Sequence, residues 1–154
     1  MEIKKAIERM LRAEEGYRDR PYDDKAGVPI FAPVGKLTIG VGHNLQDKPL
    51  TPEAIAFILN EDINDVLVEA LTLFPELETW KEGRQLAIIN MIFQLGISGF
   101  LEFRKSIEAI RKLDWDEAAK EVLKSKWAEK DSPARAIRIS EMLRTGQHFY
   151  EVNL

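Results

Sequence analysis

The sequence of 154 residues contains no cysteine, only two histidines and no excess of basic side chains. The absence of cysteine excludes disulfide bonds, thiolate metal sites and a cysteine nucleophile. The histidines, His43 and His148, lie far apart in the chain, so we expect no metal site and no cofactor. Acidic residues number 26 against 22 basic ones, and this net charge of −4 argues against a protein dedicated to nucleic-acid binding.

A long hydrophobic run is also missing. The most apolar stretch, residues 86–95, has eight apolar residues in ten, which is short of the roughly 20 that a membrane-spanning helix needs. Charged residues interrupt the first eight positions, so the N-terminus lacks the apolar centre of a secretory signal. We therefore expect no stable insertion into a membrane and a buried helix around residues 86–95.

Apolar spacing predicts a helix over residues 1–15 that ends before a glycine. Residues 16–49 are rich in glycine and proline, which is typical of turns and short strands, and residues 37–41 are the best strand candidate. A long amphipathic helix is expected next, with Thr51 as its N-cap. Three more helices are expected after the buried helix around residues 86–95. Their apolar stripes or capping residues place them at residues 103–113, 114–123 and 133–146.

This order predicts one α+β domain over residues 1–154 with a cleft between two lobes. A small β-rich N-terminal lobe is expected over about 12–60, a connecting helix over about 51–72 and a larger helical lobe over about 75–154. The helix over 1–15 is expected to pack on the helical lobe.

With so little thiol and imidazole chemistry available, carboxylates are the natural catalytic candidates. Glu15 lies where the first helix meets the irregular segment, and Asp24 follows in a turn-rich stretch. One shielded, protonated carboxyl and one ionised carboxylate are what acid-assisted glycoside hydrolysis requires. Because acidic residues are mostly solvated surface groups, spacing alone does not distinguish these two from the other acids.

An ordered series of motifs runs along nearly the whole chain. The motifs of the first half are Glu14 to Gly16, Tyr22 to Asp24, Thr38 to His43 and Asn60 to Ile63. Those of the second half are Ile89 to Gly96, Trp115 to Ala119, Ser125 to Trp127, Pro133 to Ala136 and Arg144 to Gly146. This ordered series resembles the phage-type lysozymes (endolysins) of glycoside hydrolase family 24, the T4 lysozyme group.

The resemblance implies a lysozyme-like fold and a muramidase that cleaves the β-1,4 bond between N-acetylmuramic acid and N-acetylglucosamine in bacterial peptidoglycan, causing host cell lysis. It also implies a monomer made in the host cytoplasm. Without a signal segment, such an enzyme would need a holin or similar protein to reach the cell wall in the periplasm.

Carried over residue by residue, the resemblance makes Glu15 the general acid, Asp24 the second carboxylate and Thr38 a hydroxyl that positions water. Inversion at the anomeric carbon is the family expectation, for which the carboxyl groups lie roughly 6.5–9.5 Å apart. Between Asp24 and Thr38 this chain is longer than the family pattern, with an apolar insertion inside residues 25–36. Asp23 therefore stays open as the alternative to Asp24.

Other matched positions are implied to bind substrate or to support the site. The residues at substrate-binding positions are Asn44, Phe93, Gln94, Ser106 and Arg135. The structural supports are His43, Asp62, Asn90 and Trp127, and His43 and Asp62 are expected to form an ion pair between the lobes.

Two alternatives remain open from the sequence. A non-catalytic peptidoglycan-binding or structural phage component could keep the same fold. A lytic transglycosylase also needs one acidic glutamate but releases a 1,6-anhydro sugar.

Overall fold

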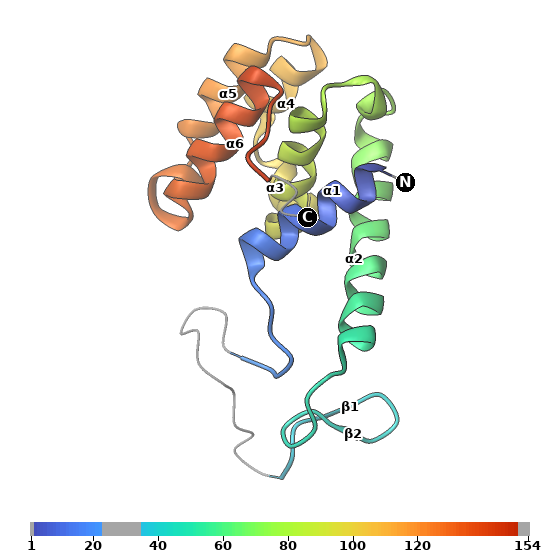
Figure 1. Cartoon of the computed structure of the whole chain (residues 1–154). Coiled ribbons are helices and arrows are strands. Elements are labelled where there is room, and N and C mark those ends of the chain that lie inside the picture. The colour runs from blue at the N-terminus through green and yellow to red at the C-terminus, as the bar shows by residue number, and fades with distance from the viewer. Residues whose placement is uncertain (1, 23–34, 151–154) are drawn as a thin grey trace.

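The computed structural model describes residues 2–22 and 35–150 and shows an α+β fold, mostly helical with one small antiparallel sheet (Figure 1). In chain order the elements are α1 (Glu2–Glu15), β1 (Thr38–Ile39), β2 (His43–Asn44), α2 (Pro52–Leu73), the 3-10 helix η1 (Leu77–Thr79), α3 (Glu82–Leu101), α4 (Arg104–Arg111), α5 (Trp115–Leu123), the π-helix η2 (Trp127–Asp131) and α6 (Pro133–Thr145).

Helix α1 follows the predicted bounds closely and carries the first candidate carboxylate at its end. Its apolar stripe, with Ile7, Met10 and Leu11, is buried, and the helix packs against α2 and α3. Gly16 continues the chain with a left-handed φ of 75°, and its N–H donates to the Arg12 carbonyl oxygen. This left-handed glycine ends the helix and turns the chain away just after Glu15.

The sheet is shorter than the sequence pattern indicates. Thr38 pairs with Asn44 and Ile39 pairs with His43 in antiparallel register, so only two residues of the expected strand over 37–41 belong to β1. Gly40 and Gly42 have φ values of 58° and 74°, which turn the chain between the strands. The resulting hairpin lies beside the N-terminal end of α2 (Figure 1).

Helix α2 has the predicted N-terminus. The Thr51 hydroxyl oxygen accepts from the Ala54 N–H at 3.2 Å, and Pro52 occupies the first turn. One side of the helix, including Ile63, is buried against the rest of the fold, while much of the remainder is exposed. The helix therefore joins the hairpin to the helical part of the molecule (Figure 1).

Helix α3 is the centre of the core, as predicted. Every residue from 86 to 92 is at most 1% exposed, and α1, α2 and α6 pack around the helix. Among the described helices, α3 alone has the length and apolar composition of a membrane span. A central core helix meets the same criterion, and burial among neighbouring helices explains the composition here.

The remaining helices differ from the sequence pattern in two details. Leu113, expected on the buried stripe of residues 103–113, is 55% exposed and has a φ of 59°, because the chain turns outward after α4. Ser132 precedes α6 but makes no side-chain cap, because its hydroxyl oxygen instead accepts from Gln94. The other predicted boundaries hold: Asp114 caps α5, and Gly146 ends α6 at a φ of 72°.

Arg84 links α3 to the end of α6 and provides a first test of the packing. Its guanidinium donates to the carbonyl oxygens of Leu143 and Arg144 at 3.0 and 3.3 Å, and it lies 4.4 Å from the ring centroid of Trp115. We expect Arg84→Lys to lower the free energy of unfolding by about 1 kcal/mol, since one ammonium cannot reproduce the fork of donors. Chemical denaturation measures the change. The exposed Arg111→Lys serves as control, and an equal loss in both variants would contradict the role of Arg84.

Candidate active site

Glu15 is the last residue of α1 and faces a hollow of about 230 Å³. The hollow lies among the end of α1, the segment that follows it, the first half of α2 and the middle of α3. The side chain of Glu15 is 36% exposed, so the carboxyl group is fixed to the protein on one side and open to the hollow on the other.

The rest of the lining is mostly apolar and aromatic. Tyr17, Tyr22 and Phe93 contribute rings, and isoleucine and leucine side chains of α2 also line the hollow. Two of the rings are accompanied by guanidinium groups, Arg12 over Tyr17 and another over Tyr22, at 5.6 and 5.5 Å from the ring centroids. Apolar walls with few polar groups are the usual composition of a ligand pocket.

Arg135, on the first turn of α6, holds the end of α1 in place. Its Nη1 lies 2.8 Å from Glu15 Oε1, its Nε lies 3.2 Å from Glu14 Oε2, and its Nη2 donates to the Glu14 carbonyl oxygen at 3.2 Å. The Arg135 side chain is only 12% exposed. The carboxyl group of Glu15 is therefore positioned by a guanidinium whose other donors are bound to the neighbouring residue.

Glu14, beside the candidate acid, is the centre of a buried polar cluster. Its side chain is 5% exposed and receives hydrogen bonds from Arg138 Nε at 3.0 Å, from Arg138 Nη2 at 2.6 Å and from the Tyr150 hydroxyl at 2.6 Å. Burial by itself would raise the pKa of Glu14, but the bonds from Arg138 and Tyr150 and the charges of both arginines outweigh burial and lower the pKa. Burial and the neighbouring Glu14 carboxylate raise the pKa of Tyr150. The cluster ties α1, α6 and the C-terminal segment together behind Glu15.

Asp62, on α2, is the second described carboxyl in the hollow. Partial burial, followed by the negative charges of Asp65 and Glu61, raises its pKa. Among the described residues no ion pair joins Asp62 to His43, and the supporting roles of these two residues stay predictions. His43 lies exposed on β2, while Asp62 is surrounded by acidic rather than basic neighbours.

The structure brings only some of the proposed site residues together. Glu15 and Phe93 line the same hollow, and Arg135 contacts Glu15. Thr38 does not line this hollow; its hydroxyl is exposed and donates to the Lys36 carbonyl oxygen at 3.0 Å. Asp24, like its alternative Asp23, lies outside the described residues.

Three positions expected to bind substrate are engaged elsewhere. Gln94 does not line the hollow and donates to Ser132. Asn44 uses its side chain within the hairpin end, where its amide donates to Asp47 at 2.9 Å and its oxygen accepts two backbone N–H groups. Ser106 is 3% exposed and donates to the Ala118 carbonyl oxygen at 2.9 Å, so its hydroxyl joins α4 to α5. A direct glycan contact by Ser106 stays a prediction.

The two supports proposed in the core are buried. Asn90 is 1% exposed at the centre of α3, and Trp127 is 5% exposed and packs edge-on against Phe103 with ring centroids 5.9 Å apart. The roles of these residues in activity stay predictions. Within residues 2–22 and 35–150, no group of three or more potential metal-binding side chains is found.

The sequence did not indicate the cluster formed by Glu14 with Arg138 and Tyr150, although Arg135 was among the predicted site residues. Glu14 and Glu15 are neighbours in the sequence, and the way α1 is rotated against the core buries Glu14 and leaves Glu15 open to the hollow. A usable signal was present, because Arg135 and Arg138 are three residues apart and so share one face of α6. Tyr150 carried no such signal, since it lies beyond the last helix.

Comparisons with known proteins agree with this geometry. The sequence matches the phage lysozyme family over residues 12–138. It is 28% identical to the probable T4-type lysozyme 1 of Dictyostelium discoideum over 92% of this chain and 95% of that protein. It is also 28% identical to the pre-baseplate central spike protein Gp5 of Enterobacteria phage T4, over 89% of this chain and 27% of that protein.

A further relative is the peptidoglycan hydrolase gp36 of Pseudomonas phage phiKMV, 28% identical over 73% of this chain and 12% of that protein. The similarity thus extends both to a protein of nearly the same extent and to parts of much longer phage proteins. The family match covers Glu15 in the last turn of α1 and Arg135 in the first turn of α6. The chain belongs to the phage lysozyme family and is a glycoside hydrolase of the lysozyme type.

Proposed function

We propose that this lysozyme hydrolyses the β-1,4 bond between N-acetylmuramic acid and N-acetylglucosamine in bacterial peptidoglycan. The observation that carries the proposal is the placement of Glu15, held by Arg135 at 2.8 Å and open to a hollow with aromatic walls. A positioned carboxylic acid beside a bound sugar can protonate the departing glycosidic oxygen.

Glu15 must hold a proton when the bond breaks. In the free protein its side chain is 36% exposed. A sugar lying over the hollow would exclude water from the carboxyl group, and exclusion of water favours the neutral acid over the carboxylate. The part of Arg135 in the proposal is to fix the position of Glu15, whose own carboxyl group supplies the proton.

The other half of the reaction is assigned to the N-terminal lobe. In the proposed two-lobed arrangement, with the cleft between the lobes, Asp24 or its alternative Asp23 and the hydroxyl of Thr38 hold the attacking water. Such a water attacks the face of the sugar opposite to Glu15 and inverts the anomeric centre, as expected where the carboxyls are roughly 6.5–9.5 Å apart. Phe93 supplies a wall against which the sugar ring packs. Gln94 and Asn44, which do not line the hollow, are proposed to bind parts of the glycan that extend beyond it.

We propose further that the protein acts as a monomer without a cofactor and causes host cell lysis. In this proposal it is made in the bacterial cytoplasm and reaches the peptidoglycan of the periplasm with the help of a holin. Mixing purified protein with intact cells, with and without permeabilised membranes, tests this part: lysis only after permeabilisation supports it.

The reaction class is tested by the mass of the products. We expect digestion of purified peptidoglycan to release muropeptides with a reducing N-acetylmuramic acid that carries one oxygen atom from isotopically labelled water. A lytic transglycosylase would release 1,6-anhydro products lighter by one water, and a non-catalytic binding protein would release none. Mass spectrometry distinguishes the three results, and either of the last two contradicts the proposal.

A further inference from the structure

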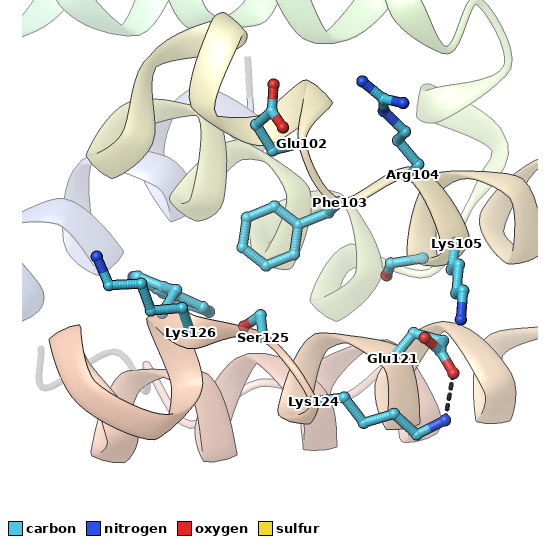
Figure 2. A pocket seen from close by; sticks show the side chains of 10 residues that line it. Glu102, Phe103, Arg104, Lys105, Glu121, Lys124, Ser125 and Lys126 are labelled. Carbon is cyan, nitrogen blue, oxygen red and sulfur yellow. Dashed lines mark hydrogen bonds and ion pairs between the residues drawn. The ribbon is translucent and has the colours of Figure 1, made fainter.

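Tyr150 lies on the C-terminal segment that follows α6, and its hydroxyl reaches α1. The hydroxyl donates to Glu14 Oε1 at 2.6 Å, and Glu14 is the residue just before the candidate acid Glu15. Tyr150 lines neither the hollow at Glu15 nor the larger hollow of about 460 Å³ between the start of α4 and the end of α5 (Figure 2). A glycan lying in either hollow would not touch Tyr150, so any effect of this residue on the reaction passes through Glu14.

The C-terminal segment is docked on the start of α3, which holds the ring of Tyr150 in place. Only a glycine fits at Gly83, because a Cβ there would clash with the Gln147 carbonyl oxygen. His148 Nε2 lies 3.2 Å from Glu82 Oε1, and the His148 ring stacks on that of Tyr150 with centroids 6.2 Å apart. The hydroxyl therefore approaches α1 from a fixed direction.

The buried carboxylate of Glu14 has all its acceptor positions filled. Its Oε1 accepts from Arg138 Nε at 3.0 Å and from the Tyr150 hydroxyl. Its Oε2 accepts from Arg138 Nη2 at 2.6 Å and lies 3.2 Å from Arg135 Nε. An ionised carboxylate offers about four such positions, two on each oxygen. Because the side chain is only 5% exposed, water has little access to replace a lost donor.

Arg135 is shared between the two neighbouring acids. Its Nε and Nη2 bind the carboxylate and the backbone carbonyl oxygen of Glu14, while its Nη1 holds Glu15 Oε1 at 2.8 Å. A buried acceptor without a partner is costly, and charged donors make the strongest bonds to a carboxylate. Loss of the Tyr150 bond would therefore draw Arg135 toward Glu14 and away from Glu15.

We propose that Tyr150 is a positioning residue for the general acid: by filling Glu14, it leaves Arg135 free to hold Glu15. The inference rests on the proposed function, in which Glu15 protonates the departing glycosidic oxygen. Burial and the Glu14 carboxylate raise the pKa of Tyr150, so its hydroxyl keeps its proton at neutral pH and serves as a hydrogen-bond donor.

The first experiment is the variant Tyr150→Phe, which removes the hydroxyl and keeps the ring. With soluble peptidoglycan fragments, we expect kcat to fall by about threefold to 30-fold and KM to stay within about twofold of the wild type. The rate falls because the acid is displaced, whereas no contact with the glycan is lost. The expected fall is smaller than the roughly 100-fold that a misplacement by 1 Å can cost, since Arg135 moves only in part.

Arg84→Lys is the matched control for a loss of stability without a positioning role. Arg84 secures the same end of α6 through the carbonyl oxygens of Leu143 and Arg144, and its replacement is also expected to lower stability. At a temperature at which circular dichroism shows both variants folded, Arg84→Lys should keep the kcat of the wild type. A wild-type kcat in Tyr150→Phe, or an equal fall in both variants, would overturn the inference.

The second experiment observes Arg135 directly and does not depend on activity. In the isotopically labelled full-length protein, the Nε–H signals of Arg135 and Arg138 report their hydrogen bonds by NMR. We expect Tyr150→Phe to shift the Arg135 signal and to speed its exchange with water, and Arg84→Lys to leave it unchanged. An unchanged Arg135 signal in Tyr150→Phe would overturn the inference even if the rate falls. Hydrolysis by the wild type reports on the proposed function alone, so the two failures are distinguishable.

Discussion

Replacing Glu15 by glutamine is expected to reduce peptidoglycan hydrolysis by about 100-fold to 10,000-fold, the range that general acid catalysis contributes. Glutamine fills the same space and can still accept a hydrogen bond from Arg135, but it has no proton to give to the departing oxygen. Because the side chain is partly exposed and the rest of the hollow is unchanged, the variant should keep its fold. Release of reducing ends from purified peptidoglycan measures the rate, and circular dichroism checks the fold.

Glu8→Gln is the matched control, because Glu8 lies on the same helix, is 44% exposed and pairs only with Arg12 among the described residues. It should hydrolyse peptidoglycan at the wild-type rate. Equal hydrolysis by the Glu15 variant and the wild type would remove the catalytic role of Glu15.

Replacing Glu14 by glutamine is expected to destabilise the protein rather than to affect the chemical step directly. The change leaves Arg135 and Arg138 without their shared carboxylate, and breaking a buried ion pair from one side costs about 3–5 kcal/mol. We expect a loss of about 3 kcal/mol, near the lower limit of that range, because Arg138 is 40% exposed and can turn to water. For a chain of this length, such a loss lowers the melting temperature by roughly 6–12 °C.

The effect of Glu14→Gln should depend on pH. Since the pKa of Glu14 is lowered in the folded protein, its charged form stabilises the fold above the unfolded pKa, and this contribution is lost as the pH falls through the folded pKa. The difference in unfolding free energy between wild type and variant should therefore be full at neutral pH and shrink in acid. Denaturation at a series of pH values measures the difference; one that stays constant into strong acid would contradict the ionic role of Glu14.

Several features of the fold were predictable because they depend on short stretches of sequence. The left-handed glycine after Glu15, the Thr51 cap and the first-turn proline of α2 each act within a few residues, and each occurs as predicted. The burial of α3 was predictable for a related reason, since a stretch apolar on all sides can only lie inside the fold. In contrast, the strand over residues 37–41 was overestimated, because two glycines turn the chain sooner than its apolar pattern suggests.

In the candidate site, too, some features depend on nearby residues and others on tertiary packing. By itself, the sequence placed Glu15 at the end of a helix, beside a turn that frees its side chain for a hollow. The contact of Arg135 with Glu15 joins residues 120 positions apart, and the cluster of Glu14 with Tyr150 joins residues 136 apart. Tertiary structure alone decided these contacts, and it alone buried Ser106 and left His43 exposed on β2. The physical reason is that caps, turns and helical stripes are set by neighbours in sequence, whereas burial and charge pairing depend on how helices rotate and pack.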